Sequence, residues 1–148
     1  MCEKKYLVAI LENEDPASSN KWKLACGKAG VEYDIIQLHH NDWLERIRAR
    51  EYSFCLLKPP GEIERFKQLY DERVYIIVKV LGIKTFPSYE EAYIYENKKL
   101  LSYFLKARKI PHPKTFVFYE KNDALQFVND TEFPIVAKTS IGASGTGV

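Results

Sequence analysis

The chain has 148 residues and a formal net charge of +2, with 46% hydrophobic and 28% charged residues. This length predicts one domain, or one small domain with part of another, and the apolar content excludes an intrinsically disordered chain. No apolar run approaches the roughly 20 residues of a membrane-spanning helix, and the apolar stretch near the N-terminus is too short for a secretory signal core. The small net charge favours neither nucleic acid nor an anionic membrane as a partner. We therefore expect a globular cytoplasmic protein.

The three cysteines, Cys2, Cys26 and Cys55, have neither the spacing of a redox motif nor that of a zinc site. Reduced thiols in a cytosolic protein are the expected state. Cys55 lies within the apolar run Phe54-Cys55-Leu56-Leu57 and is predicted to be a core residue.

The first 86 residues alternate short apolar runs with amphipathic segments. The predicted strands lie at 6–11, 31–38, 53–57 and 83–86, and the predicted helices at about 22–29, 43–47 and 62–81. Residues 75–80 also fit a strand, but Gly82 as a stop signal favours the helix. Ser18 or Ser19 and Asn41 or Asp42 are candidate N-caps of the first two helices. The alternation predicts a small, doubly wound parallel α/β sheet with helices on both faces.

From Pro87 onward the pattern changes, which predicts a boundary between residues 1–87 and 88–148. Ser88 and Glu91 have the spacing of a capping box, and Asn97 is a candidate cap for a helix over 98–109. A short helix over 122–129 separates two further predicted strands, at 114–119 and 134–138. This second part is predicted to be α+β.

The strongest chemical signal is the glycine-rich C-terminal stretch. Its glycines alternate with hydroxyl residues, and the members are Ser140, Gly142, Ser144, Gly145, Thr146 and Gly147. Loops of this kind bind phosphate oxygens through backbone N–H and hydroxyl donors. The order of residues excludes a Walker loop and the dinucleotide fingerprint, and Lys138 precedes the loop at the end of a predicted strand. The alternative is a frayed terminus that binds nothing.

Four segments, taken in order, resemble the ATP-grasp superfamily. They are Glu96-Asn97-Lys98-Lys99, Ile110-Pro111-His112-Pro113-Lys114-Thr115, Phe133-Pro134-Ile135-Val136-Ala137-Lys138 and Gly142-Ala143-Ser144-Gly145-Thr146-Gly147-Val148. In that superfamily an Asp-Lys pair opens a helix, a Gly-Ile-Pro-x-Pro-like turn closes it, and Pro-x-Val-x-Lys leads to a glycine-rich loop. Asn97 stands where aspartate is usual. The resemblance implies a Rossmann-like pre-ATP-grasp domain over 1–87 and an incomplete ATP-grasp subdomain over 88–148.

The same resemblance implies a role in ATP-dependent ligation. Lys98 and Lys138 would contact the phosphates of ATP, and Ser144, Gly145 and Thr146 would close over them as a flap. A carboxylate, on a small molecule or a peptide, would attack the γ-phosphate, and an amine or thiol would then displace phosphate from the acyl phosphate. Mg²⁺ would bridge the phosphates, with its ligands expected after residue 148. The chain alone is therefore expected to be an inactive N-terminal part of a longer ligase.

Two alternatives remain open at this point. A non-catalytic binding module similar to a flavodoxin or receiver domain fits the repeated βα units. However, Lys58 follows the third predicted strand where a receiver needs aspartate, and Leu11-Glu12-Asn13-Glu14 is not a flavin-phosphate loop. A regulatory relic would keep the fold without using ATP. An unpaired strand near Ile135 or Val136 would also allow a homodimer.

The substrate side is predicted from the topology alone. Ligands of open α/β sheets bind beyond the C-terminal ends of the strands, which points to the loops at 12–20, 39–41 and 58–61. His39 and His40 are candidates for contact with a substrate or metal, although loop histidines are more often plain surface residues. The carboxylates of Glu12, Glu14 and Asp15 favour a solvated turn over an acid–base pair.

Overall fold

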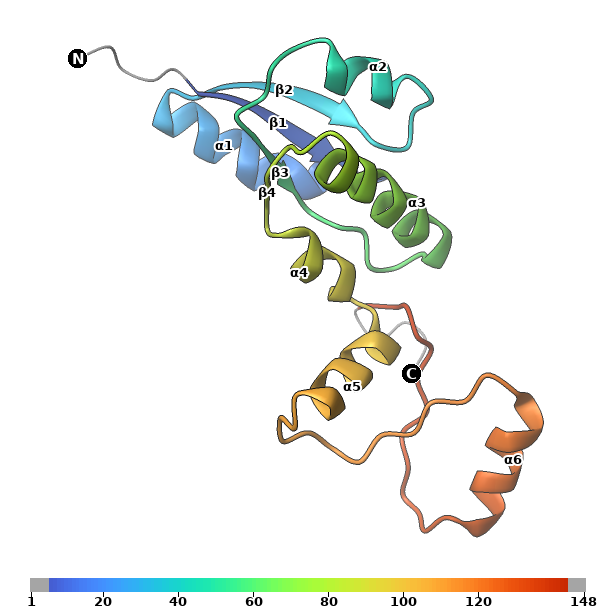
Figure 1. The fold of residues 1–148 in the computed structure, drawn as a ribbon. Coiled ribbons are helices and arrows are strands. Elements are labelled where there is room, and N and C mark those ends of the chain that lie inside the picture. Colours follow the sequence, from blue (N-terminus) through green and yellow to red (C-terminus); the bar gives the residue numbers. More distant parts are fainter. Residues whose placement is uncertain (1–5, 144–148) are drawn as a thin grey trace.

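The computed structural model describes residues 6–143, which form two lobes (Figure 1). The first lobe is built on a four-stranded sheet, and the second consists of helices and irregular segments. The helix α4 (Tyr89–Ile94) lies between them.

The sheet of the first lobe is parallel throughout. Its strands are β1 (Leu7–Glu12), β2 (Glu32–Gln37), β3 (Phe54–Leu57) and β4 (Thr85–Phe86), in the order β2-β1-β3-β4. Ile10 at the centre pairs with Ile35 on one side and with Leu56 on the other. The predicted parallel sheet is confirmed, with all four strands close to their expected positions.

Helices cover both faces of this sheet (Figure 1). Because side chains alternate along a strand, Val8 and Ile10 of β1 pack with Cys26 of α1 (Asn20–Ala29). Ala9 and Leu11 point the other way. They join the larger core cluster with residues of α2 (Trp43–Arg48) and α3 (Glu64–Tyr75). The sheet is therefore doubly wound, as its apolar runs predicted.

Residues that start or stop helices predicted the ends of several helices correctly. Gly30 ends α1 with a φ of 64°, a conformation that glycine adopts without strain. The helix α3 runs directly into a π-helical segment, Ile76–Val80, which confirms the helical prediction over 62–81. At α4, the Ser88 hydroxyl accepts from the Glu91 N–H at 3.2 Å while Glu91 accepts from the Ser88 N–H at 2.8 Å. The predicted capping box is thus confirmed.

The caps of α1 and α2 follow the prediction in position but not in chemistry. Ser19 and Asp42 occupy the N-cap positions, yet neither side chain bonds to the helix that it precedes. A 3₁₀ helix, Pro16–Ser19, comes before α1 and is capped instead by Asp15, which accepts from the Ala17 N–H at 3.0 Å. Ser19 is turned inward to Glu12, because the buried carboxylate needs a donor.

In the second lobe, the helices α5 (Lys98–Ala107) and α6 (Lys121–Asp130) confirm two predictions. The strands predicted at 114–119 and 134–138 are wrong, because neither segment is a strand in the structure. A strand needs a neighbouring strand for its backbone N–H and C=O groups, and no strand within residues 6–143 pairs with either segment. Phe116 and Phe118 pack instead against Phe127 of α6, with ring centroids 4.6 and 5.2 Å away.

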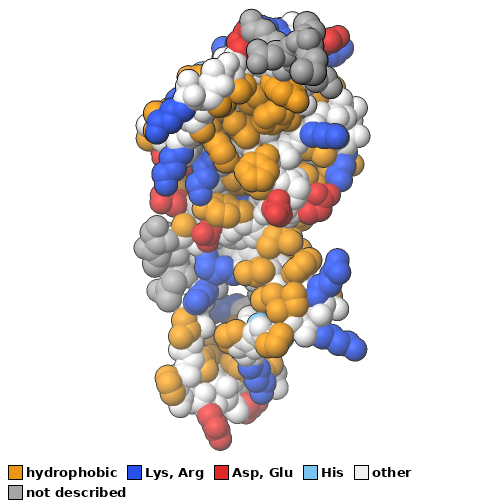
Figure 2. Space-filling view, turned by 90° about the vertical axis from the view of Figure 1, so that its left-hand side faces the viewer, with side chains coloured by type: hydrophobic (Ala, Val, Ile, Leu, Met, Phe, Trp, Pro, Cys, Tyr) orange, Lys and Arg blue, Asp and Glu red, His pale blue; other side chains and the backbone are white. Residues whose placement is uncertain are grey.

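Apolar side chains stay exposed on this lobe, and on the face drawn in Figure 2 they gather over both lobes. Val136 is 71% exposed, and Leu101 and Phe104 of the apolar face of α5 are also exposed. Pairing of two copies near Ile135 or Val136 stays a prediction. None of the helices within residues 6–143 has the length and apolar character needed to cross a bilayer.

The two cysteines within the described residues are free thiols in the core. Cys55 is fully buried, as predicted, and its burial raises the pKa of the thiol to about 12. It therefore stays protonated and unreactive at neutral pH. Cys2 lies outside the described residues.

A buried ion pair joins the first lobe to α4. Lys67 of α3 is only 1% exposed, and its ammonium lies 2.6 and 2.5 Å from the two carboxylate oxygens of Asp71. It also donates to the backbone carbonyl of Tyr93 in α4 at 3.2 Å. Burial lowers the pKa of Lys67 and raises the pKa of Asp71, while the opposite charge of each partner opposes the shift. Each of the two buried charges is thus stabilised by its partner.

We predict that Asp71→Ala destabilises the chain by about 3 kcal/mol, because it leaves the Lys67 ammonium buried without its counter-ion. The double variant Lys67→Met/Asp71→Leu should recover most of that loss. Urea unfolding followed by circular dichroism measures both. Glu72→Ala, on an exposed position of the same helix, is the control and should change stability by no more than about 0.5 kcal/mol. An equal loss in the single and double variants would contradict the prediction.

Candidate functional site

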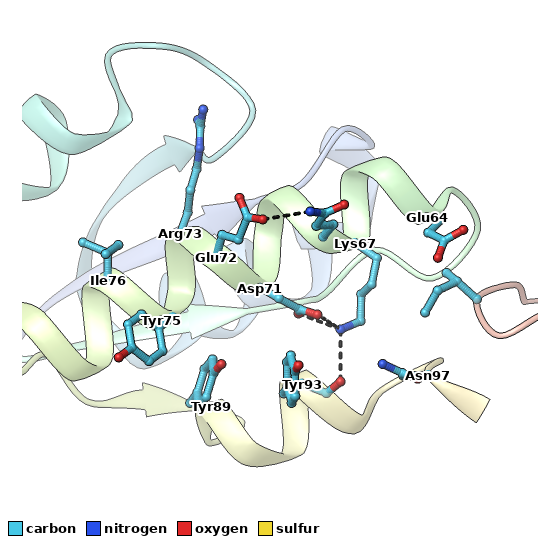
Figure 3. A pocket seen from close by; sticks show the side chains of 12 residues that line it. Glu64, Lys67, Asp71, Glu72, Arg73, Tyr75, Ile76, Tyr89, Tyr93 and Asn97 are labelled. Carbon is cyan, nitrogen blue, oxygen red and sulfur yellow. Dashed lines mark hydrogen bonds and ion pairs between the residues drawn. The ribbon is translucent and has the colours of Figure 1, made fainter. Parts of the chain in front are cut away.

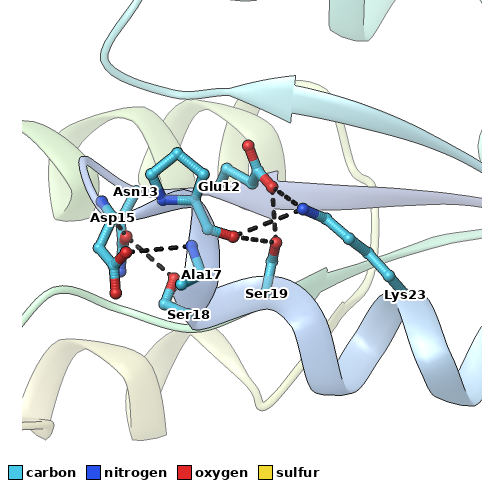
Figure 4. Close-up of polar contacts among 8 residues, drawn as sticks. Glu12, Asn13, Asp15, Ala17, Ser18, Ser19 and Lys23 are labelled. Atoms are coloured by element: carbon cyan, nitrogen blue, oxygen red, sulfur yellow. Dashed lines mark hydrogen bonds and ion pairs between the residues drawn. The ribbon is translucent and has the colours of Figure 1, made fainter.

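The loop after β1 is held by an internal network of polar contacts (Figure 4). Glu12 is 2% exposed, and its carboxylate accepts from the Ser19 hydroxyl at 2.6 Å and pairs with the Lys23 ammonium at 2.6 Å. Asn13 donates to the Lys58 carbonyl at 2.9 Å and accepts from the Asp15 N–H at 2.8 Å. The prediction of a solvated turn is therefore wrong for Glu12, which is buried and paired. These contacts give it a structural role.

The contacts of Glu12 set its protonation. Burial alone would raise the pKa of its carboxyl, but the bonds from Lys23 and Ser19 outweigh burial and lower that pKa below its usual value. The carboxylate form is thus favoured in the folded chain. At the C-terminal end of β1, the negative charge of Glu12 is balanced by the positive charge of Lys23.

The loop after β2 places the two histidines in edge-to-face contact, with ring centroids 4.4 Å apart. His39 is half-buried, and its Nδ1 is shielded from solvent with no hydrogen-bond partner among residues 6–143. Arg73 of α3 holds the loop by donating to the carbonyls of Leu38 and, at 2.6 Å, His40. Within the described residues, no group of three His, Cys, Asp or Glu side chains is arranged to hold a metal ion.

The loop after β3 packs on the chain that leads into α5. The Lys58 ammonium donates to the Tyr95 hydroxyl at 2.7 Å and lies 4.4 Å from the centre of its ring. Gly61 faces Glu96 so closely that an added Cβ would lie 2.6 Å from the Glu96 Cγ. Glu96 itself has a φ of 51°, which turns the chain sharply before α5. A loop expected to face substrate therefore also supports the second lobe.

The N-terminus of α5 gathers the start of the glycine-rich stretch. Asn97 caps the helix by accepting from the Leu100 N–H at 3.0 Å, which confirms the predicted cap. Asn97 also forms an isolated antiparallel bridge with Ile141, and the Lys98 N–H donates to the Ser140 carbonyl at 2.8 Å. The Lys98 ammonium donates to the carbonyl of Gly142, which is buried.

The structure therefore brings three of the predicted phosphate-binding residues together, namely Lys98, Ser140 and Gly142. Lys138 is exposed and makes no hydrogen bond, ion pair or ring contact with any residue of the described part of the chain. The remaining candidates, Ser144, Gly145, Thr146 and Gly147, lie outside the described residues.

The contact between the start of α5 and residues 140–142 is called the junction below. A pocket of about 790 Å³ opens beside it (Figure 3). It runs between α3 and α4, and Asn97 and Ile141 also line it. The Lys67–Asp71 pair lies along its wall, and Tyr89 and Tyr93 stack beside it with ring centroids 5.6 Å apart. Sequence reasoning missed this pocket. The spacing of Lys67 and Asp71 is the i,i+4 spacing of a helical ion pair, but it carried no sign that the pair is buried.

Comparison with known proteins gives one partial match. The chain is 36% identical, over 50 residues, to a protein of Saccharolobus solfataricus described as the alpha-aminoadipate–LysW ligase LysX. The match covers 34% of this chain and 18% of that ligase. No family model matches the chain. The comparison thus indicates a likeness to part of a ligase.

We predict that Glu12→Gln destabilises the chain by about 1–2 kcal/mol at pH 7, because the ion pair with Lys23 is lost and Ser19 no longer donates to a charged group. The folded-state pKa of Glu12 is lowered, so its stabilisation is present above the unfolded pKa of roughly 4.3 and is lost as pH falls through the folded value. The difference between wild type and Glu12→Gln should therefore shrink below about pH 4. Urea unfolding between pH 3 and 7 measures it, with the exposed Glu51→Gln as control. A difference that does not change with pH would contradict the assignment.

Proposed function

We propose that the chain binds the phosphates of ATP beside the N-terminus of α5 and contributes part of the nucleotide site of an ATP-dependent ligase of the ATP-grasp type. The contact between Lys98 and Gly142, which are 44 residues apart, carries the proposal. It brings a lysine from the start of one helix to the start of a glycine-rich stretch, and the resemblance in sequence implies phosphate binding by both.

The chemistry of this junction suits a polyphosphate. A lysine ammonium has three N–H donors, and among the described residues Lys98 uses one of them. The N-terminus of α5 adds the partial positive charge of its helix dipole, and the exposed Lys138 lies in the segment that enters the junction. Two cations are appropriate for a triphosphate, which carries about four negative charges.

The ligase chemistry proceeds in two displacements. A carboxylate oxygen of the substrate attacks the γ-phosphorus of ATP, the bond from that phosphorus to ADP breaks, and an acyl phosphate forms. The nitrogen of an amine, or a thiol sulfur, then attacks the acyl carbon, phosphate leaves, and the nucleophile loses its proton. The residues of this chain would bind and orient the phosphates. Mg²⁺ would supply charge neutralisation in such a transfer.

Three observations support this proposal together. The ordered motifs resemble ATP-grasp enzymes, the partial match is to a protein described as a ligase, and the parallel sheet precedes the residues that we propose for phosphate binding, as the resemblance implies. By this proposal, the loops after β1, β2 and β3 face the carboxylate substrate, because open α/β sheets bind ligands at that edge. His39 is the side chain there with a shielded and unpartnered nitrogen.

We predict that Lys98→Ala and Lys138→Ala each weaken ATP binding at least tenfold, because each removes a charge-assisted hydrogen bond to phosphate. Isothermal titration of the chain with ATP measures this. Lys99→Ala and Lys121→Ala remove the same charge elsewhere and should change affinity less than about threefold. Equal losses in all four variants would indicate non-specific charge attraction. Failure of the wild-type chain to bind millimolar ATP would refute the nucleotide site.

Turnover distinguishes the ligase from the regulatory relic. In a longer protein that contains this sequence, Lys138→Ala should abolish ATP-dependent ligation while the protein stays folded. ATP binding without any ligation by that longer protein would instead favour the relic.

A further inference from the structure

The Lys98 side chain makes a contact that phosphate binding alone does not require. Its ammonium donates to the backbone carbonyl of Gly142, and Gly142 is buried with a φ of 154°. A lysine that served only as a cation for a ligand would be expected to point into solvent in the free chain. Here it holds the backbone of the loop that precedes the proposed flap.

Two backbone contacts fix the same loop to the same helix end. The Lys98 N–H donates to the Ser140 carbonyl at 2.8 Å, and Ile141 bridges to Asn97. The Ser140 hydroxyl also lies 3.4 Å from the Asn97 side-chain oxygen, which already caps α5. Residues 140–142 are therefore docked on the start of α5 by side-chain and backbone contacts.

We propose that Lys98 is a positioning residue: its ammonium bonds at the same time to the backbone of the glycine-rich loop and to bound phosphate. One N–H of the ammonium holds the Gly142 carbonyl. The other two have no partner among residues 6–143 and can donate to phosphate oxygens, so that a single side chain bonds both the loop and the ligand. This inference rests on the proposed nucleotide site. It adds that loop docking and phosphate binding stabilise each other.

The coupling follows from linkage. A ligand that binds the docked loop more tightly than the undocked loop shifts the population toward docking, and docking must then raise the affinity by the same factor. A lysine that bound phosphate independently of the loop would give no such coupling. The two cases therefore differ in a measurable way.

The first arm of the test uses hydrogen exchange of the residue-98 backbone amide in the free chain, because this amide is bonded to the Ser140 carbonyl. Lys98→Met should make it exchange about tenfold faster, since the side-chain bond that keeps the loop docked is lost. Lys99→Met is the matched control. Its ammonium lies over the ring of Tyr119 at 5.0 Å and not on the loop, so it should leave the exchange unchanged. An unchanged rate in Lys98→Met would overturn the proposal.

The second arm measures coupling with inorganic tripolyphosphate as the probe. Binding should slow the exchange of the residue-98 amide in the wild-type chain and not in Lys98→Met. The affinity is then measured for Lys98→Met, for Gly142→Ala, whose side chain disfavours the observed φ, and for the double variant. Each single change should weaken binding at least tenfold, and the double variant should lose little more than the worse single variant.

The outcomes separate this proposal from the proposed function. If the affinity lost in the double variant equals the product of the two single losses, Lys98 and Gly142 act independently. That result would overturn the proposed coupling and leave the phosphate site in place. A wild-type chain that binds neither tripolyphosphate nor ATP would refute both the phosphate site and the coupling of phosphate binding to loop docking. The exchange arm needs no change at Gly142, so the proposal stays testable if Gly142→Ala fails to fold.

Discussion

The second lobe depends on four consecutive residues, Tyr95 to Lys98, each of which contacts a distant segment. Tyr95 accepts from Lys58, and Glu96 packs on Gly61. Asn97 bridges to Ile141, and Lys98 holds Gly142. These contacts are possible together because the positive φ of Glu96 turns the chain between them. The segment therefore connects the loop after β3 with the start of the glycine-rich stretch.

Two buried ion pairs connect elements of the first lobe. Glu12 is neutralised by Lys23, and Lys67 is neutralised by Asp71. A buried charge without a partner would cost several kcal/mol, so each pair fixes the elements that carry it. Glu12 joins β1 to α1, and Lys67 joins α3 to α4 through the Tyr93 carbonyl. Both ion pairs are thus part of the fold itself.

In the proposed ligase, the nucleotide would bind at the start of α5, and the carboxylate substrate would bind at the loops after β1, β2 and β3. The loops after β1, β2 and β3 are held by hydrogen bonds within the chain, and the start of α5 carries the Lys98 ammonium. The pocket between α3 and α4 ends at this junction, beside Asn97 and Ile141, so it shares the same support (Figure 3).

The sequence by itself determined the parallel sheet, the order of its helices and the ends marked by Gly30, Ser88 and Asn97. These features are encoded within a few neighbouring residues, by apolar periodicity and capping groups. Only the tertiary structure decided the burial of Glu12, the contact of Lys98 with Gly142 and the absence of strands at 114–119 and 134–138. Each of these depends on a partner far away in the chain, and a local pattern cannot specify whether that partner is within reach.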